Sequence, residues 1–141
     1  MTTLSADTPR DYQLGDIESL PVIAADIIYE GAAVGENGSG YSRPLAAGDA
    51  FQGFAVEKVD NSAGSAGDKR VTVRTRGRVQ LAIASIAITA NDRPAVYASD
   101  DNTFTLTSTS NSLIGYVSRW VETGVAIVEF DAGLCKAALH S

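Results

Sequence analysis

The sequence predicts an all-β protein, a small β-barrel or sandwich of roughly seven to eight short strands with an extended N-terminal arm and a short C-terminal tail that can form a helix. Three observations support this fold class. Apolar and polar residues alternate over residues 68–83, turn-forming residues recur at intervals of about ten residues, and a helical period is absent before the tail. We therefore expect an arm over residues 1–20, one β-domain over 21–132 and a tail over 133–141.

The clearest strand covers residues 68–83, DKRVTVRTRGRVQLAI. Mostly apolar or small residues occupy one parity, and Arg74, Arg76 and Arg78 lie on the other, which is the period of two of a half-buried strand. A helix would instead bury guanidinium groups without an acidic partner, which is costly. Gly77 has the inward parity, so we expect a bend, a bulge or a closely passing backbone there.

The other strands are predicted from apolar runs between turn-forming residues. The run over 22–34 indicates one kinked strand or two abutting strands, and the turn signal Asn37-Gly38 follows it. Residues 51–59 indicate a further strand, with a Ser/Gly loop after it. Two predicted hairpins complete the set, 94–98 with 103–107 and 113–121 with 125–131. This spacing is typical of a barrel or a sandwich.

The arm is polar and is broken by Pro9 and Gly15. It is either a frayed terminus without a role or a segment that adds to the edge of a partner's sheet. Its apolar anchors would be Leu4, Tyr12, Leu14 and Ile17. The tail is too short to be a stable helix in isolation, so it either docks on the body as a helix or is loose.

Composition limits the classes of partner. The formal net charge is −6, so we expect no nucleic-acid partner, because phosphates attract Lys and Arg. The single cysteine, Cys135, cannot form an intrachain disulfide, and no secretory leader is recognisable, so we expect the chain to fold in a reducing cytoplasm. No apolar run approaches the roughly 20 residues of a membrane helix, so no membrane is expected. Apolar residues make up 45% of the chain, many of them alanine, and such a thin core favours oligomerisation.

The sequence contains no catalytic constellation. The one histidine, His140, is the second-last residue, whereas nucleophilic catalysis needs a histidine positioned inside the fold. Cys135 and His140 supply two ligands where a zinc site needs at least three. Most acidic residues lie in predicted turns or at strand ends, where they normally accept hydrogen bonds from local backbone groups. We therefore expect no enzymatic activity, no cofactor and no metal site.

The arginine row, formed by Arg74, Arg76 and Arg78, is the one concentrated basic feature. Either these charges keep an exposed strand face soluble, or they pair with carboxylates of a neighbouring subunit. Trp120 is either a core residue or an anchor of a subunit interface. These four residues are our candidates for a subunit interface.

Several motifs follow one another in a characteristic order after the apolar segment IIYEGAAV. They are Gly53-Phe54-Ala55, Ala66-Gly67-Asp68, Gly77-Arg78-Val79, Val96-Tyr97 before an Asp-rich turn, and Leu113-Ile114-Gly115 before a closing apolar strand. In this order and spacing, over about residues 27–132, the chain resembles the capsid cement, or head decoration, proteins of tailed bacteriophages.

The resemblance implies a β-barrel-like module that forms a homotrimer on the outer surface of the phage head and locks neighbouring subunits of the major capsid protein together. It implies a location in the virion, with the arm as the capsid-binding segment and the folded body as the source of the trimer contacts. Two other classes stay open. One is a carbohydrate-binding or tail-associated β-module, and the other is a trimeric dUTPase-like hydrolase, whose nucleotide-binding loops are not recognisable in this sequence.

Overall fold

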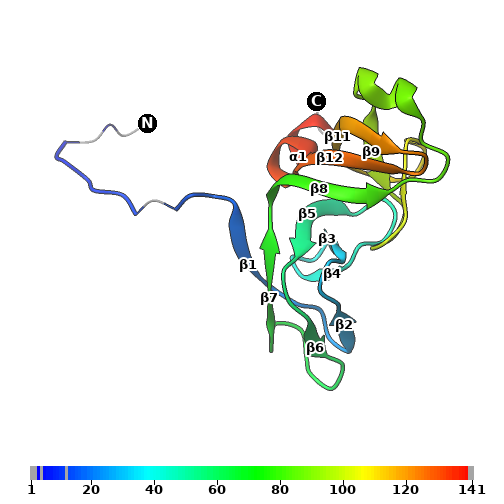
Figure 1. Cartoon of the computed structure of the whole chain (residues 1–141). Helices are drawn as coiled ribbons and strands as arrows, with labels where there is room; N and C mark the ends of the chain where they lie inside the picture. Colours follow the sequence, from blue (N-terminus) through cyan, green and yellow to red (C-terminus); the bar gives the residue numbers. More distant parts are fainter. Residues whose placement is uncertain (1–2, 4, 12, 140–141) are drawn as a thin grey trace.

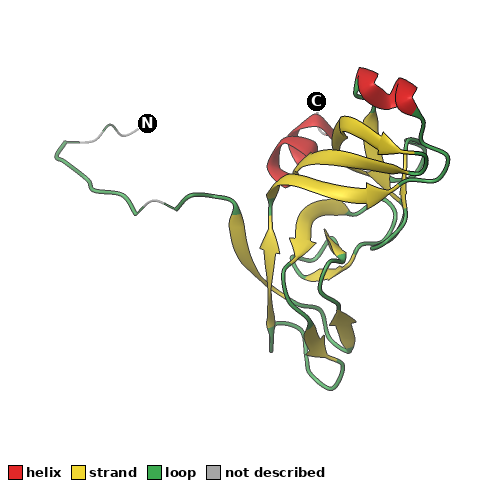
Figure 2. Cartoon of the chain, viewed as in Figure 1, coloured by secondary structure: helices red, strands yellow, loops and turns green. Residues whose placement is uncertain are grey.

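The computed structural model describes residues 3, 5–11 and 13–139. The predicted all-β fold class is confirmed, and of the two predicted architectures the structure has the sandwich. The described residues form two five-stranded antiparallel sheets and a two-stranded sheet, with a short α-helix at the C-terminal end (Figure 2).

The first sheet has the order β1-β7-β5-β3-β4. Its hairpin β3–β4 closes over the predicted Asn37-Gly38 turn. The Oδ1 atom of Asn37 accepts hydrogen bonds from the backbone N–H groups of Ser39 at 2.8 Å and Tyr41 at 3.2 Å, which fixes the turn. The strands of this sheet are β1 (Ile17–Pro21), β7 (Arg70–Arg74), β5 (Ala50–Ala55), β3 (Ala33–Glu36) and β4 (Ser42–Pro44).

The second sheet has the order β10-β9-β11-β12-β8, so β8 is an edge strand. Both predicted hairpins, β9–β10 and β11–β12, are confirmed and lie side by side in this sheet. The 3₁₀ helix η1 (Ile88–Asp92) lies between β8 and β9 in the chain. The strands are β10 (Phe104–Thr105), β9 (Ala95–Ala98), β11 (Ser112–Glu122), β12 (Val125–Asp131) and β8 (Arg76–Ala82).

The third sheet pairs β2 (Asp26–Ile28) with β6 (Val59–Asn61). The apolar run over 22–34 therefore forms two strands in different sheets, β2 and β3, which agrees with the second of its two interpretations.

The predicted strand over residues 68–83 is two strands, because the chain passes from the first sheet to the second at Thr75. The alternation continues through the break. Val71 and Val73 pack in one core, whereas Val79 and Leu81 pack against the other. The expected bend lies two residues before Gly77, which itself has a φ of 145°.

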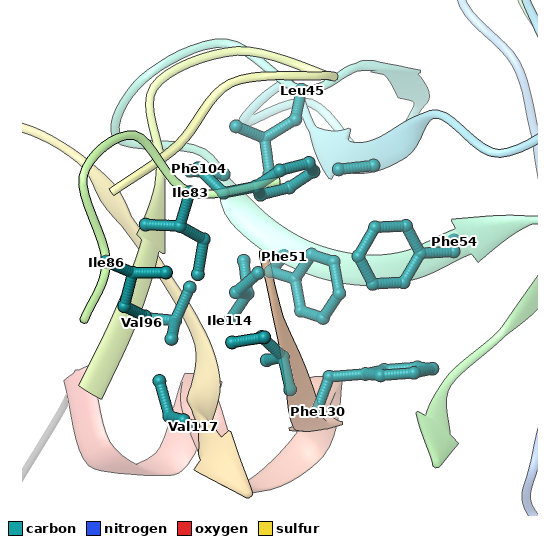
Figure 3. Packing of buried hydrophobic residues seen from close by; sticks show 14 of the residues in the cluster. Leu45, Phe51, Phe54, Ile83, Ile86, Val96, Phe104, Ile114, Val117 and Phe130 are labelled. Atoms are coloured by element: carbon teal, nitrogen blue, oxygen red, sulfur yellow. The ribbon is translucent and has the colours of Figure 1, made fainter. Parts of the chain in front are cut away.

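The main core lies between the two large sheets and is built around phenylalanines (Figure 3). The ring of Phe54 contacts that of Phe130 edge to face, with centroids 4.9 Å apart, and that of Phe51 at 5.4 Å. A smaller core on the other face of the first sheet contains Ile28, Val71 and Val73. Successive strand residues point to opposite faces, which is why Phe54 belongs to the main core and Ala55 to the smaller one.

Of the two interpretations of the tail, helical or loose, the structure has the helix, α1 (Ala132–Leu139), which follows β12 directly. The Oδ1 atom of Asp131 accepts a hydrogen bond from the N–H of Leu134 at 3.1 Å and caps its first turn.

Candidate functional site

The most conspicuous feature outside the body is the arm, which extends away from both sheets (Figure 1). Its described residues before Leu14 are exposed, and no backbone hydrogen bond joins them to the body. Among these residues the one side-chain hydrogen bond runs from the Thr8 hydroxyl to the Ala6 carbonyl, at 3.3 Å. This part of the arm therefore presents unpaired backbone donors and acceptors.

The root of the arm, by contrast, is firmly attached at the point where the chain changes sheets. The N–H of Thr75 donates to the Asp16 carbonyl at 2.9 Å, and its hydroxyl donates to the Gly15 carbonyl at 2.8 Å. The Arg76 guanidinium donates to the Leu14 carbonyl at 2.9 Å. On its other side, the Thr75 carbonyl accepts a hydrogen bond from the N–H of Ala132, the first residue of α1.

The four predicted arm anchors have different positions. Ile17 is the first residue of β1 and lies opposite Arg74, so the projecting arm ends at Asp16 rather than at residue 20. Leu14 lies at the root with 86% of its surface exposed. Leu4 and Tyr12 fall outside the described residues.

Each member of the arginine row has a partner within the same chain. Arg78 forms an ion pair with Glu129 at 3.0 Å, and Arg74 lies 3.9 Å from the Asp16 carboxylate. Arg76 bonds to the carbonyl at the arm root, as described above. These contacts within one chain agree with the interpretation of the arginine row as an exposed, solvated strand face. Pairing of the row with carboxylates of a neighbouring subunit stays a prediction.

A polar ladder crosses the outer face of the second sheet. The Tyr116 hydroxyl donates to the Glu129 carboxylate at 2.7 Å, and Arg78 donates to its other oxygen. The hydrogen bond to Glu129 raises the pKa of Tyr116, because it favours the protonated phenol. The hydrogen bonds from Tyr116 and then Arg78 lower the pKa of Glu129. The carboxylate is thus held ionised and oriented on an exposed surface.

This ladder forms one wall of an open groove of about 920 Å³. Leu14 from the arm root, Tyr116 and Leu134 line it, and all three are among the exposed large apolar residues of the body and root. Arg76 and Arg93 also reach the groove. The volume is within the range of small-molecule sites, and the mixture of apolar and charged walls also suits a peptide segment.

Trp120 packs against the main core while staying partly accessible. Its indole N–H donates to the Ile86 carbonyl at 3.3 Å, and its backbone N–H donates to Asn91 Oδ1 at 2.7 Å. The core interpretation therefore accounts for this side chain, and its role in a subunit interface stays a prediction.

The described residues of the tail show no assembled reaction centre. Cys135 is buried, with 6% exposure, and burial raises the pKa of its thiol to about 11. His140 lies outside the described residues. Over the part of the chain that the structure describes, no three His, Cys, Asp or Glu side chains gather as metal ligands.

Two turn aspartates bond locally, as the sequence predicts. Asp60 accepts hydrogen bonds from the backbone and hydroxyl of Ser62, and Asp100 accepts from Asn102 and Thr103. These bonds lower the pKa of both carboxyls. Burial raises the pKa of Asp101 instead, and the neighbouring Asp100 charge adds to this.

Sequence reasoning missed two buried polar pairings. Arg43 holds the buried Asp49 with two hydrogen bonds of 2.9 and 2.7 Å. Asn61, with 1% exposure, donates from Nδ2 to the carbonyls of Ile23 and Ser65 at 2.8 and 3.0 Å. The alternation around Asp49 and Asn61 gives no signal that either side chain is buried and paired.

No family model matches the chain, and no curated protein matches it. Among the described residues, no helix has the length and apolar character required to cross a membrane.

Proposed function

We propose that this protein is a capsid decoration, or cement, protein, which binds the outer surface of a bacteriophage head as a trimer and stabilises contacts between major capsid protein subunits. The arm carries this proposal. An extended segment with unpaired backbone groups, attached at a fixed point of a small β body, is suited to adding a strand to the edge of another protein's sheet.

The root contacts explain how such an arm would transmit load. Asp16 and Gly15 bond to Thr75, and β1 pairs with β7 over five residues. An arm that is bound to the shell is therefore connected to the first sheet through the β1–β7 pairing and to the second sheet through Thr75, where the chain changes sheets. The chemistry of the arm is hydrogen bonding and burial of apolar anchors, and it needs no cofactor.

Undecorated heads test the proposal directly. Purified protein is mixed with heads that lack decoration, and attachment is followed by sedimentation and by cryo-electron microscopy. We expect density at the local three-fold positions of the shell and greater resistance of the heads to heat. A variant without residues 2–8 keeps β1 and the arm root but loses the outer arm, and we expect it to attach weakly or not at all. Equal attachment by both proteins would refute the role of the outer arm, and no attachment by the full chain would refute the function.

A carbohydrate-binding module is the second candidate, and the groove favours it. Glycan-binding proteins use exposed aromatic rings together with oriented polar side chains, and Tyr116, Glu129 and Arg78 provide these groups beside the groove. Screening purified protein against an oligosaccharide array distinguishes the two candidates. Tyr116→Ala should abolish any glycan signal while leaving attachment to heads unchanged.

A further inference from the structure

We propose that the groove beside the polar ladder binds a small organic acid, whose carboxylate pairs with Arg93 and whose apolar body lies on Leu113 and Leu134. The inference goes beyond the two candidate functions above, because neither gives a role to Arg93 or to the apolar wall of the groove. It depends neither on the outer arm nor on a phage head.

The apolar wall of the groove consists of side chains from separate elements that leave hydrocarbon uncovered. Leu134 of α1 and Leu14 of the arm root have 70% and 86% of their surface exposed. Leu113 of β11 is half-buried and Ala95 of β9 lies in the same wall. A ligand that covered these side chains would remove their surface from water, which is a main source of affinity in small-molecule sites.

Three carboxylates line the groove, and each already has a partner within the chain. Glu129 accepts the two hydrogen bonds of the polar ladder, at 3.0 and 2.7 Å. Asp131 caps the first turn of α1, and Asp16 lies 3.9 Å from Arg74. These partners reduce the repulsion that the three carboxylates would exert on the carboxylate of a ligand.

Arg93 is the cation of the groove that is available to a ligand. No residue that the structure describes forms an ion pair or a side-chain hydrogen bond with its guanidinium, whereas Arg78 pairs with Glu129 and Arg76 donates to a carbonyl. The hydrogen bonds of the polar ladder lower the pKa of Glu129, and the charge of Arg93 adds to this, so that charge acts on the groove. A guanidinium binds a carboxylate with two parallel hydrogen bonds.

The backbone of Arg93 is held in an unfavourable conformation. Its φ of 64° and ψ of 56° lie in the left-handed region that residues with a side chain rarely adopt, and Pro94 favours an extended conformation for the residue before it. Neighbouring bonds fix this conformation: Asn91 Oδ1 accepts from the N–H of Trp120 at 2.7 Å, and the Pro94 carbonyl accepts from the N–H of Val117 at 2.9 Å. Glycine would adopt this backbone without strain, so we attribute the arginine to a role of its side chain, because strained residues gather at binding sites.

A small acid suits the available groups of the groove better than a peptide segment. Each peptide unit brings an N–H and a C=O that need partners when they leave water. Most of the charged side chains of the groove already bond within the chain, and much of its wall is apolar. A carboxylate on an apolar body needs one cation and a hydrocarbon surface, and the volume of about 920 Å³ is sufficient for it.

Three probes with the same apolar body test the site: phenylbutyrate, phenylbutanol and phenylbutylamine. Each is titrated into the full chain at neutral pH, and binding is followed by calorimetry and by NMR of isotope-labelled protein. We expect the acid to bind at least about fivefold more tightly than the alcohol, with chemical-shift changes centred on Arg93, Leu113 and Leu134. Equal binding of acid and alcohol would overturn the inference, and so would tighter binding of the amine.

The variant Arg93→Gln removes the charge, so we expect it to lose the preference for phenylbutyrate while phenylbutanol binds as before. The matched control is Arg119→Gln, at an exposed arginine of β11 outside the groove, which should keep the preference. If both variants keep it, Arg93 is not the carboxylate-binding residue and the inference is wrong.

The variant Arg93→Gly separates a binding role from a structural one. Because glycine suits the left-handed backbone, we expect a higher midpoint of urea unfolding together with loss of the preference for phenylbutyrate. A lower midpoint would show that the Arg93 side chain serves the fold, against the inference. A capped tripeptide with leucines on both sides of a glutamate is titrated in parallel, and tighter binding of this peptide would assign the groove to a protein partner instead of a small acid. Attachment to heads does not enter these measurements, so each of these results leaves the proposed function as it stands.

Discussion

Gly53 lies where β5 meets β7, next to the point at which the chain changes sheets, and alanine should not be tolerated there. Its φ of 126° is a conformation that residues with a side chain rarely adopt, and such strain costs about 1–3 kcal/mol. A Cβ atom at this position would also lie 2.9 Å from the carbonyl carbon of Arg74 and 3.2 Å from the Cα of Thr75, with the Arg74 carbonyl oxygen closer still. Because these are backbone atoms, β5 and β7 would have to separate. We expect Gly53→Ala to lower the free energy of unfolding by about 3–5 kcal/mol, a large part of the total stability of a small domain.

The control is Gly124→Ala, in the turn between β11 and β12. Gly124 also has a positive φ, 83°, but a Cβ there would meet nothing within 4 Å, so the substitution should cost about 1 kcal/mol. Urea unfolding of wild type and both variants, followed by tryptophan fluorescence, gives the three free energies. If the two variants lose equal stability, the close approach of β5 and β7 at Gly53 is wrong, because strain alone would then explain both.

Three further predictions follow from the polar and titratable groups. Glu129→Gln removes the carboxylate that holds the Tyr116 hydroxyl, so the pKa of Tyr116 should fall toward its ordinary value. Absorbance titration of the phenol measures this pKa, and an unchanged titration curve would contradict the hydrogen bond between Tyr116 and Glu129. Asn61→Asp replaces a buried donor with a buried carboxylate and should cost about 2–4 kcal/mol in urea unfolding, so an unchanged midpoint would show that the two bonds of Nδ2 are unimportant. The pKa of Cys135 rises on folding from 9.0 to about 11, so the folded state holds the thiol proton more tightly than the unfolded state. The free energy of unfolding should therefore fall as the pH rises through this window, and Cys135→Ala should lack that part of the decline. Equal declines in wild type and variant would refute this contribution of the thiol.

Local signals predicted most of the second sheet. The β9–β10 and β11–β12 hairpins join neighbours in sequence, and their alternation and turn residues are sufficient to identify them. The same holds for the Asn37-Gly38 turn. The sequence left the tail either helical or loose, and contacts with β5 and β11 explain why a helix forms there despite its length.

The sheet switch at Thr75 could not be predicted, because the alternation of residues 68–83 is uninterrupted through it. The alternation shows which residues are buried but not which core they belong to. Here the apolar residues of β7 lie in the smaller core, and those of β8 pack against the main core. The strand β1 was missed for a related reason. Its residues Ile17 to Pro21 have a weak pattern, and the ladder depends on Arg70 to Arg74, about fifty residues later in the chain. The groove and its polar ladder could not be predicted for the same reason. Tyr116, Glu129 and Arg78 come from three different strands, which only the folded sheet brings together.

The long separation between β1 and β7 also sets an order of events during synthesis. Residues 14–16 leave the ribosome well before their anchoring partner Thr75, and Ala132 follows later still. In a copy that is still being synthesised, or that is misfolded, the arm therefore has no fixed point of attachment. Only a chain in which both sheets have met at Thr75 presents the arm in a defined position, so completed folding is a precondition for the attachment that we propose.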